Sequence, residues 1–193
     1  MKYYNLNEAL PHPSHSVAVD TQIIYWVFYA DDNMPEDKKP WQTEKYSRYI
    51  EHLLSNGNKI VIFGGVLLEL FKIIEINEHK LYLDLNGKTS DEVSLKDFRE
   101  IPYERKRLKK ILNLVYKQIT QISTFVFDAI NEHITSTYIS EFEHHHSDFV
   151  DFALVKFCEE KHISHILTDD KDFKTIETDV SIISGNRIYF SQN

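Results

Sequence analysis

Short apolar runs alternate along this chain with longer segments in which apolar residues recur every three or four positions. Short apolar runs are typical of buried strands, whereas the three-and-four spacing indicates amphipathic helices. The predicted strands are residues 16–19, 59–63, 123–127 and 165–167, with one or two more in the tail at 180–183 and 187–190. The predicted helices are residues 21–29, 41–56, 66–78, 103–121, 131–142 and 148–161. The alternation predicts an α/β fold, a three-layer α/β/α sandwich around a central, mainly parallel sheet.

The pattern also predicts which side chains two of the helices bury. In the helix at 103–121 the expected buried stripe is Leu108, Ile111, Leu112, Val115 and Ile119. In the helix at 131–142 the side chains expected to point inward are Ile134, Tyr138, Ile139 and Phe142. Both sets follow the spacing of a single helical face.

Three segments depart from this regular pattern. Residues 1–14 form a polar lead-in, and residues 30–40 an acidic loop that we expect to be solvated. Residues 80–87 alternate weakly and predict a hairpin arm that closes at its Asn-Gly end. We interpret residues 79–122 as an insertion into a single domain spanning 1–193, and expect its irregular first part, residues 79–102, to form a cap over the functional site.

Composition limits the kinds of protein this can be. The chain has 193 residues, of which 42% are hydrophobic, enough for one substantial globular domain. Its formal net charge of −8 is unlike that of a simple nucleic-acid coat protein. A single cysteine, Cys158, cannot form a disulfide within the chain, which predicts a reducing, cytoplasmic location. No run of apolar residues is long enough to predict a membrane span.

Acidic residues stand where the predicted strands end or the following helices begin. They are Asp20 after 16–19, Glu69 one turn beyond 59–63, Asp148 and Asp151 at the start of 148–161, and Asp170 and Asp172 after 165–167. The carboxyl ends of parallel strands share one edge of a sheet, where ligands bind. We therefore expect these acids to converge. The alternative for any one of them is a helix cap that serves stability alone.

Converging carboxylates call for a cation. Two like charges about 4 Å apart repel by roughly 4 kcal/mol at an effective dielectric constant near 20, so several could not stay ionised together. Mg²⁺, or Mn²⁺ at the same oxygen-rich site, would remove this repulsion. Such an ion can activate water for hydrolysis of a phosphodiester without a covalent intermediate. The sequence therefore predicts Mg²⁺ (or Mn²⁺) as the cofactor.

The segments VAVDT, VLLEL, DFVDFAL and TDDKDF together resemble the PIN-domain nucleases, over residues 15–190. The resemblance implies catalytic roles for Asp20, Glu69, Asp151 and Asp170. It implies metal ligation by Asp20, Asp148, Asp151, Asp170 and Asp172, with the choice between Asp148 and Asp151 as the main helix ligand left open. Thr21 and Thr168 would lie against the substrate. Asp169 falls at the variable position of the TDDKDF ending and is assigned no role.

Two polar runs allow more than one interpretation. The basic run of the helix at 103–121, with Arg105, Lys106 and Lys109, could guide a nucleic-acid backbone towards the acids. A solvated charged face explains the same run equally simply. The run His144–His146 predicts a solvated turn rather than a zinc site, because three consecutive histidines cannot all face one point.

The function that these patterns and the resemblance predict is a metal-dependent endoribonuclease. By analogy with small bacterial members of that family, it would be the toxin of a toxin–antitoxin pair. Its partners would be the RNA substrate, an antitoxin protein and a second copy of the chain. Two alternatives stay open: a PIN-like scaffold that binds RNA or protein without cutting, and a metal-dependent DNA nuclease or phosphatase. The chain is longer than a typical toxin of the family, chiefly through residues 79–122.

Overall fold

The computed structural model describes residues 1–7, 11–30, 40–126 and 130–190. Its centre is a six-stranded sheet in the order β1-β6-β5-β2-β3-β4, and every pair of neighbouring strands is parallel. The strands are β1 (Tyr3–Asn5), β2 (Ser16–Val19), β3 (Lys59–Phe63), β4 (Ser123–Val126), β5 (His165–Leu167) and β6 (Ser181–Ser184). The predicted parallel α/β sheet is confirmed.

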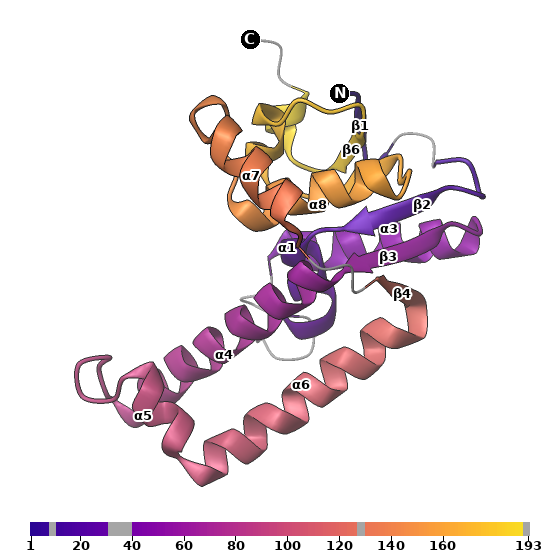
Figure 1. Ribbon diagram of the computed structural model, residues 1–193. Coiled ribbons are helices and arrows are strands. Elements are labelled where there is room, and N and C mark those ends of the chain that lie inside the picture. The colour runs from indigo at the N-terminus through magenta and orange to yellow at the C-terminus, as the bar shows by residue number, and fades with distance from the viewer. Residues whose placement is uncertain (8–10, 31–39, 127–129, 191–193) are drawn as a thin grey trace.

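Helices cover both faces of this sheet, as Figure 1 shows. They are α1 (Thr21–Ile24), which continues as a π-helical turn η1 (Tyr25–Ala30), α3 (Trp41–Ser55), α4 (Gly64–Asn86), α5 (Leu95–Glu100), α6 (Pro102–Ile122), α7 (Glu132–Glu141) and α8 (Phe149–Glu160). Shorter 3-10 turns are η3 (Phe142–His144), η4 (Lys171–Thr175) and η5 (Arg187–Tyr189). In Figure 1, α8 lies in front of the sheet and α3 behind it. This is the three-layer α/β/α arrangement.

The core lies between the sheet and these helices, and it explains why the apolar runs became strands. Val17, Ala18 and Val19 of β2 and Ile166 and Leu167 of β5 are almost fully buried. Both faces of a parallel sheet are covered, so a central strand reads as a continuous apolar run. Phe152, Leu154 and Val155 of α8 are fully buried against the sheet. No helix among the described residues is long and apolar enough to cross a membrane.

The predicted hairpin at 80–87 is wrong. These residues continue α4, which ends at Asn86 and is capped by Gly87 in the left-handed conformation with φ of 59°. The Asn-Gly pair is thus a helix stop, a role glycine fills because it has no Cβ to clash there. Leu83, Val93 and Phe98 form a small separate core between α4 and α5.

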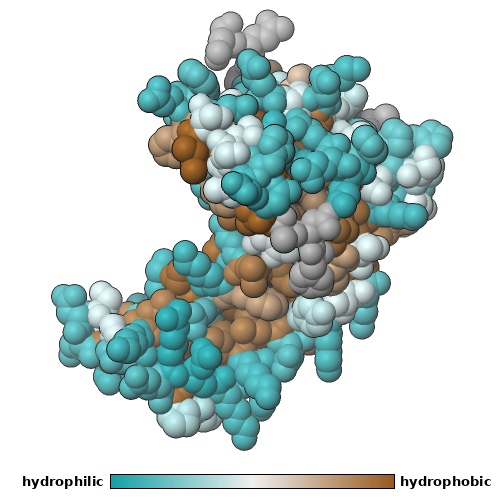
Figure 2. All heavy atoms as spheres, viewed as in Figure 1, coloured by the Kyte–Doolittle hydropathy of each residue, from teal (hydrophilic) through white to brown (hydrophobic). Residues whose placement is uncertain are grey.

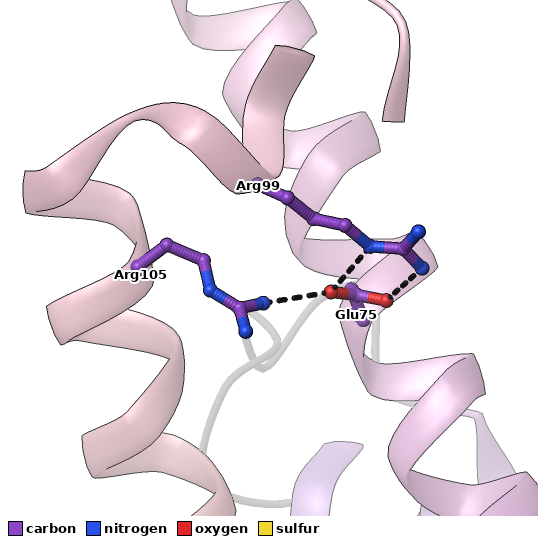
Figure 3. Close-up of polar contacts among 3 residues, drawn as sticks. All are labelled: Glu75, Arg99 and Arg105. Atoms are coloured by element: carbon purple, nitrogen blue, oxygen red, sulfur yellow. Dashed lines mark hydrogen bonds and ion pairs between the residues drawn. The ribbon is translucent and has the colours of Figure 1, made fainter. Parts of the chain in front are cut away.

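We call α4, α5 and α6 together the helical arm. Figure 1 shows its two long helices leaving the sheet at β3 and β4 and meeting α5 at the far end. The arm projects away from the sheet, so residues 79–102 do not fold over it as the expected cap. Ion pairs hold the arm together. Glu75 of α4 binds Arg99 and Arg105, as Figure 3 shows, at 2.5 and 3.0 Å.

Several smaller predictions also change. The lead-in contains the edge strand β1, and the last predicted strand, 187–190, is the 3-10 turn η5. The predicted helix at 21–29 is divided between α1 and a π-helical turn. The last residue of the predicted strand 123–127, and residues 31–39 of the acidic loop, lie outside the described residues.

The predicted buried stripes are only partly right. In α6, Leu108, Val115 and Ile119 are buried, whereas Ile111 and Leu112 are half-buried. On the helix predicted at 131–142, Ile134 is buried, but Ile139 and Phe142 are 68% and 59% exposed. Two apolar side chains that the pattern had assigned to the core, one in α7 and one in η3, are therefore at the surface.

Candidate functional site

Asp20 lies where β2 gives way to α1. Its N–H donates to the carbonyl of Leu167, which extends the ladder between β2 and β5 by one residue. Its carboxylate caps α1 by accepting the N–H of Thr21 at 2.5 Å. The other carboxylate oxygen accepts the hydroxyl of Thr168 at 2.7 Å. Asp20 is only 4% exposed, so it is a buried acid fixed by two donors.

Glu69 reaches the same place from α4. The helix begins directly after β3, which brings Glu69 to the carboxyl edge of the sheet. Its carboxylate accepts the hydroxyl of Thr21 at 2.6 Å. Thr21 therefore connects the two acids, because its N–H binds Asp20 and its hydroxyl binds Glu69. Thr21, predicted to lie against substrate, is instead buried and orients two carboxylates.

Asp170 completes this chain of contacts from the β5 side. Its N–H donates to the hydroxyl of Thr168 at 3.0 Å, and that hydroxyl donates in turn to Asp20. Its carboxylate accepts the side-chain amide of Gln22 at 3.3 Å and the N–H of Asp172 at 2.9 Å. Asp170 also accepts the Tyr189 hydroxyl on its backbone carbonyl. Glu69, Asp20 and Asp170 are thus joined through two threonines.

Helix α8 adds Asp148 and Asp151. Asp148 is the N-cap of the helix and accepts the N–H groups of Val150 at 2.8 Å and Asp151 at 3.0 Å. Asp148 is exposed, and Asp151 stands in the first turn and is largely covered. The capping role that the sequence offered as an alternative is therefore real for Asp148. Asp151 is the acid of α8 whose pKa is affected by the charges of Asp20 and Asp170.

The electrostatics show that the five acids share one environment. Burial, together with the charges of Asp20, Asp148, Asp170 and Glu69, raises the pKa of Asp151 to about 9. Burial also raises the pKa of Asp20 to about 7, with smaller contributions from Asp170 and Glu69, against the opposing hydrogen bonds of Thr168 and Thr21. We call Asp20, Glu69, Asp148, Asp151 and Asp170 the acid cluster.

Glu69 belongs to the same electrostatic group. Burial raises its pKa, and the charges of Asp148 and Asp170 act in the same direction. The hydrogen bond from Thr21 and the cation of Lys72 oppose the rise. A raised pKa means that ionising the carboxyl group costs more free energy here than in water, because burial and like charges both disfavour the anion.

Two acids of the TDDKDF ending lie apart from this group. Asp172 donates its N–H to Asp170, but its carboxylate is not among the largest influences on the pKa of Asp20, Glu69 or Asp151. Asp169 turns the other way and accepts the Tyr46 hydroxyl and the Gln42 amide. The structure therefore brings together the predicted acids except Asp172, and leaves Asp169 outside as expected.

The predicted substrate-binding cations lie on the arm. Arg105 is bound to Glu75, so part of its charge is used within the protein. Lys106 and Lys109 are exposed on α6, and no ion pair involves either of them among the described residues. The histidine run is a solvated turn only in part. His144 and His146 are exposed, whereas His145 is buried, stacks on Phe152 and bonds to the Ser147 hydroxyl.

Sequence reasoning missed three residues that bear on the acid cluster. Gln22 binds Asp170, the Tyr189 hydroxyl binds the Asp170 carbonyl, and Lys72 influences Glu69. Lys72 lies one turn after Glu69, so it could have been found from helical spacing. Gln22 is next to Thr21 in the sequence, and that spacing does not indicate a shared helix face. Tyr189 comes from η5, and only the tertiary fold brings it here.

The oxygen atoms of the acid cluster suit a hard divalent cation, but the carboxylates do not surround a single ion. All five members of the acid cluster offer oxygen, which Mg²⁺ and Mn²⁺ prefer. Across the described ranges, however, no three His, Cys, Asp or Glu side chains lie close enough together to hold a metal ion. Protein Mg²⁺ is often held by one or two carboxylates with water completing the shell. A pair of these acids is therefore the arrangement that fits the cation.

The chain matches no protein-family model and no curated protein. The resemblance to the PIN-domain nucleases therefore rests on the motifs alone and stays a prediction, as do the toxin role, the antitoxin and the second copy. Function has to be argued from the acid cluster itself.

Proposed function

We propose that this protein is a metal-dependent endoribonuclease that hydrolyses RNA phosphodiester bonds at the acid cluster. The observation that carries the proposal is the hydrogen-bonded chain that joins Glu69, Asp20 and Asp170, acids from three separate parts of the sequence, through two threonines. Beside it stand the raised pKa values of Asp20 and Asp151, about 7 and about 9. Residues with strongly perturbed pKa values gather at functional sites. The choice of RNA over DNA comes from the motif resemblance.

Ionised acids in the acid cluster cost free energy in the folded protein. The raised pKa values of Asp20, Glu69 and Asp151 mean that ionising these acids lowers the stability of the folded protein unless a ligand compensates the charge. Natural proteins keep such strain chiefly where function needs it. A bound Mg²⁺ or Mn²⁺ would supply compensation, a Lewis acid for the phosphate and activation of water. The cluster lies at the carboxyl edge of a parallel sheet, where α/β proteins bind their ligands.

Each residue has a task that its contacts support. Asp20 and Asp151 are the most buried acids of the acid cluster. In their ionised form they would hold the cation. Thr21 and Thr168 keep Asp20 in one orientation, because each donates to a different carboxylate oxygen. Glu69 and Asp170 lie at the ends of this hydrogen-bonded chain, where either could accept a proton from water.

The test is cleavage by the purified protein of mixed RNAs and of single-stranded DNA, with Mg²⁺, with Mn²⁺ and with chelator. We expect RNA to be cut only when a divalent cation is present. Asp20→Asn and Asp170→Asn should abolish cleavage and leave RNA binding largely intact. Asp179→Asn is the matched control, because Asp179 is an exposed acid outside the cluster. Unchanged cleavage in both cluster variants, or none by the wild type, would overturn the proposal. Cleavage of DNA alone would favour the DNA nuclease.

A further inference from the structure

A groove runs between the two long helices of the arm. Phe71 of α4 and Leu108 and Leu112 of α6 line it, together with the ring of Tyr116 and the side chains of Arg105, Lys106 and Lys109. Its volume is about 700 Å³, and most of its surface is apolar. Apolar atoms are exposed between these helices in the view of Figure 2. None of the described residues that line the groove is acidic.

The charge of the groove distinguishes it from the rest of the molecule. The protein has a formal net charge of −8, yet the groove is lined by three cations and no described acid. Arg105 is bound to Glu75, whereas Lys106 and Lys109 form no ion pair with any described acid. Long cationic side chains can place their stems on apolar surface and keep the charge in water. The groove therefore suits a polyanion that also has flat apolar parts.

The exposed face of α4 connects this groove to the acid cluster. Residues three or four apart share a helix face. Glu69 and Lys72 are three apart, Lys72 and Leu68 are four apart, and Leu68 and Phe71 are three apart. Leu68 is 73% exposed and Lys72 is exposed, so this path across the helix is open. Lys72 influences the pKa of Glu69, which places its cation at the cluster end of the path.

We propose that this groove binds the single-stranded RNA that flanks the bond to be cut, with bases on Phe71 and Tyr116 and phosphates on Lys106 and Lys109. This inference rests on the proposed function, and it specifies that the RNA substrate is single-stranded. Single strands are bound by basic grooves with aromatic side chains on which bases stack. Tyr116 is 40% exposed and its ring is held against Phe125 at 5.6 Å between centroids, so it is positioned before RNA arrives. A duplex hides the faces of its bases and cannot use these rings.

The phosphate contacts are tested by binding in the absence of cleavage. A labelled RNA of about 20 nucleotides without secondary structure is titrated with protein in chelator, and anisotropy is followed at several salt concentrations. In Lys106→Gln/Lys109→Gln we expect about tenfold weaker binding, and a salt dependence that is shallower by about 1.4 in the log–log slope. The matched control is Lys110→Gln/Lys117→Gln, on the same helix with the same change of charge. Both its lysines are exposed and lie outside the groove.

The stacking contact is tested at Tyr116. Tyr116→Leu keeps the apolar bulk and should weaken single-strand binding roughly tenfold, whereas Tyr116→Phe should bind like the wild type. Neither should change the affinity for a duplex of the same sequence. Equal loss in the lysine control, equal affinity of the wild type for duplex and single strand, or no binding of single strands would each overturn the proposal.

The two proposals can fail separately. If Asp20→Asn stops cleavage while the groove variants bind and cut like the wild type, the nuclease stands and the groove does not carry RNA. If the groove variants lose binding but the wild type cuts nothing with Mg²⁺ or Mn²⁺, the groove stands and the nuclease falls. Capture of a protein partner at the groove with no affinity for RNA would overturn the groove proposal.

Discussion

The ion-paired acids of the helical arm and the most buried acids of the acid cluster are both largely covered, but they have opposite surroundings. In the helical arm, Glu75 is held by Arg99 and Arg105, and their hydrogen bonds and charges lower its pKa. Glu78, only 1% exposed, is bound by Arg107 and accepts the Tyr29 hydroxyl at 2.7 Å. In the acid cluster, burial and neighbouring acids raise the pKa of Asp20, Glu69 and Asp151. The arm neutralises its acids from within the chain, and the cluster does not.

Under the proposed function, the difference separates acids that stabilise the fold from acids that bind a cation. A buried charge needs a partner, since its desolvation costs several kcal/mol. Arginines of α5 and α6 provide that partner in the arm. At the cluster, the partners among the described residues are backbone N–H groups, the hydroxyls of two threonines, a glutamine amide and the more distant Lys72. Removing compensation should therefore harm the arm, and supplying it should benefit the cluster.

The largest effect is expected where a paired acid loses its cation. Arg107→Met leaves Glu78 buried without a counter-charge, and we expect a loss of about 3 kcal/mol in the free energy of unfolding. The side chain of Arg107 is 31% exposed, so water will screen part of the penalty. Urea unfolding at pH 7 measures it. The double variant Glu78→Leu/Arg107→Met is the control and should recover most of the loss. A cost below about 1 kcal/mol for the single variant would mean that Glu78 reaches water.

The next effect is the pH dependence of the cluster. The pKa values of Asp20 and Asp151 are raised, so both acids bind protons more tightly folded than unfolded. Their contribution to stability is full below about pH 4, the unfolded pKa of an aspartate, and is lost as pH rises through about 7 and 9. In chelator, the wild type should therefore lose stability as pH rises from 5 to 9, by up to about 1.4 kcal/mol per pH unit for each of these two protons.

Comparing unfolding at pH 5 and pH 9 in wild type and Asp151→Asn isolates this contribution. Asparagine does not ionise, so the stability of the variant should fall less steeply with pH, and the variant should be more stable than the wild type at pH 9. Asp179→Asn should follow the wild type. Parallel pH profiles for wild type and Asp151→Asn would show that the cluster is less strained than its pKa values imply.

A divalent cation should remove part of that strain. Mn²⁺ at about ten times its dissociation constant adds about 1.4 kcal/mol to the stability of the folded form, or a few degrees in Tm for a chain of this length. Thermal unfolding with and without Mn²⁺ at pH 7.5 measures the shift. Asp20→Asn should lose it, and Glu75→Gln, which alters an acid of the arm, should keep it. An equal shift in all three proteins would place the ion elsewhere.

Much of the cluster could be read from the sequence because its acids mark the ends of apolar runs. Asp20 and Asp170 follow β2 and β5, and parallel strands bring their carboxyl ends together whatever the details of packing. Tyr189 and Gln22 could not be assigned in the same way, because a turn near the end of the chain and a side-chain rotamer place them. Asp172 lies in the first turn of η4, of which Asp170 is the N-cap, and its role as a metal ligand stays a prediction.

The arm was misread for a physical reason that its leucines make plain. Leu81, Leu83 and Leu85 alternate along the sequence, and an Asn-Gly pair follows, as in a hairpin. In the helix only Leu83 is buried, while Leu81 and Leu85 are 40% and 76% exposed. The burial of Leu83 depends on Phe98 and Val93, which α5 and the turn before it supply. Local alternation cannot report a contact made fifteen residues further on.

The smallest effect is expected at the exposed ion pair between Arg99 and Glu75 of the arm. Arg99→Ala removes one of two cations from Glu75, and the side chain of Arg99 is 48% exposed. Arg105 remains and water screens the exposed pair, so we expect only a small loss of stability at pH 7. The pKa of Glu75 is lowered, so its stabilisation is present above the unfolded pKa of a glutamate, about 4.3, and is lost as pH falls. Urea unfolding of wild type and Arg99→Ala should therefore differ at pH 7 and converge near pH 3. An equal difference at both pH values would assign the cost to lost packing of the arginine stem, because only the charged pair responds to protonation of Glu75.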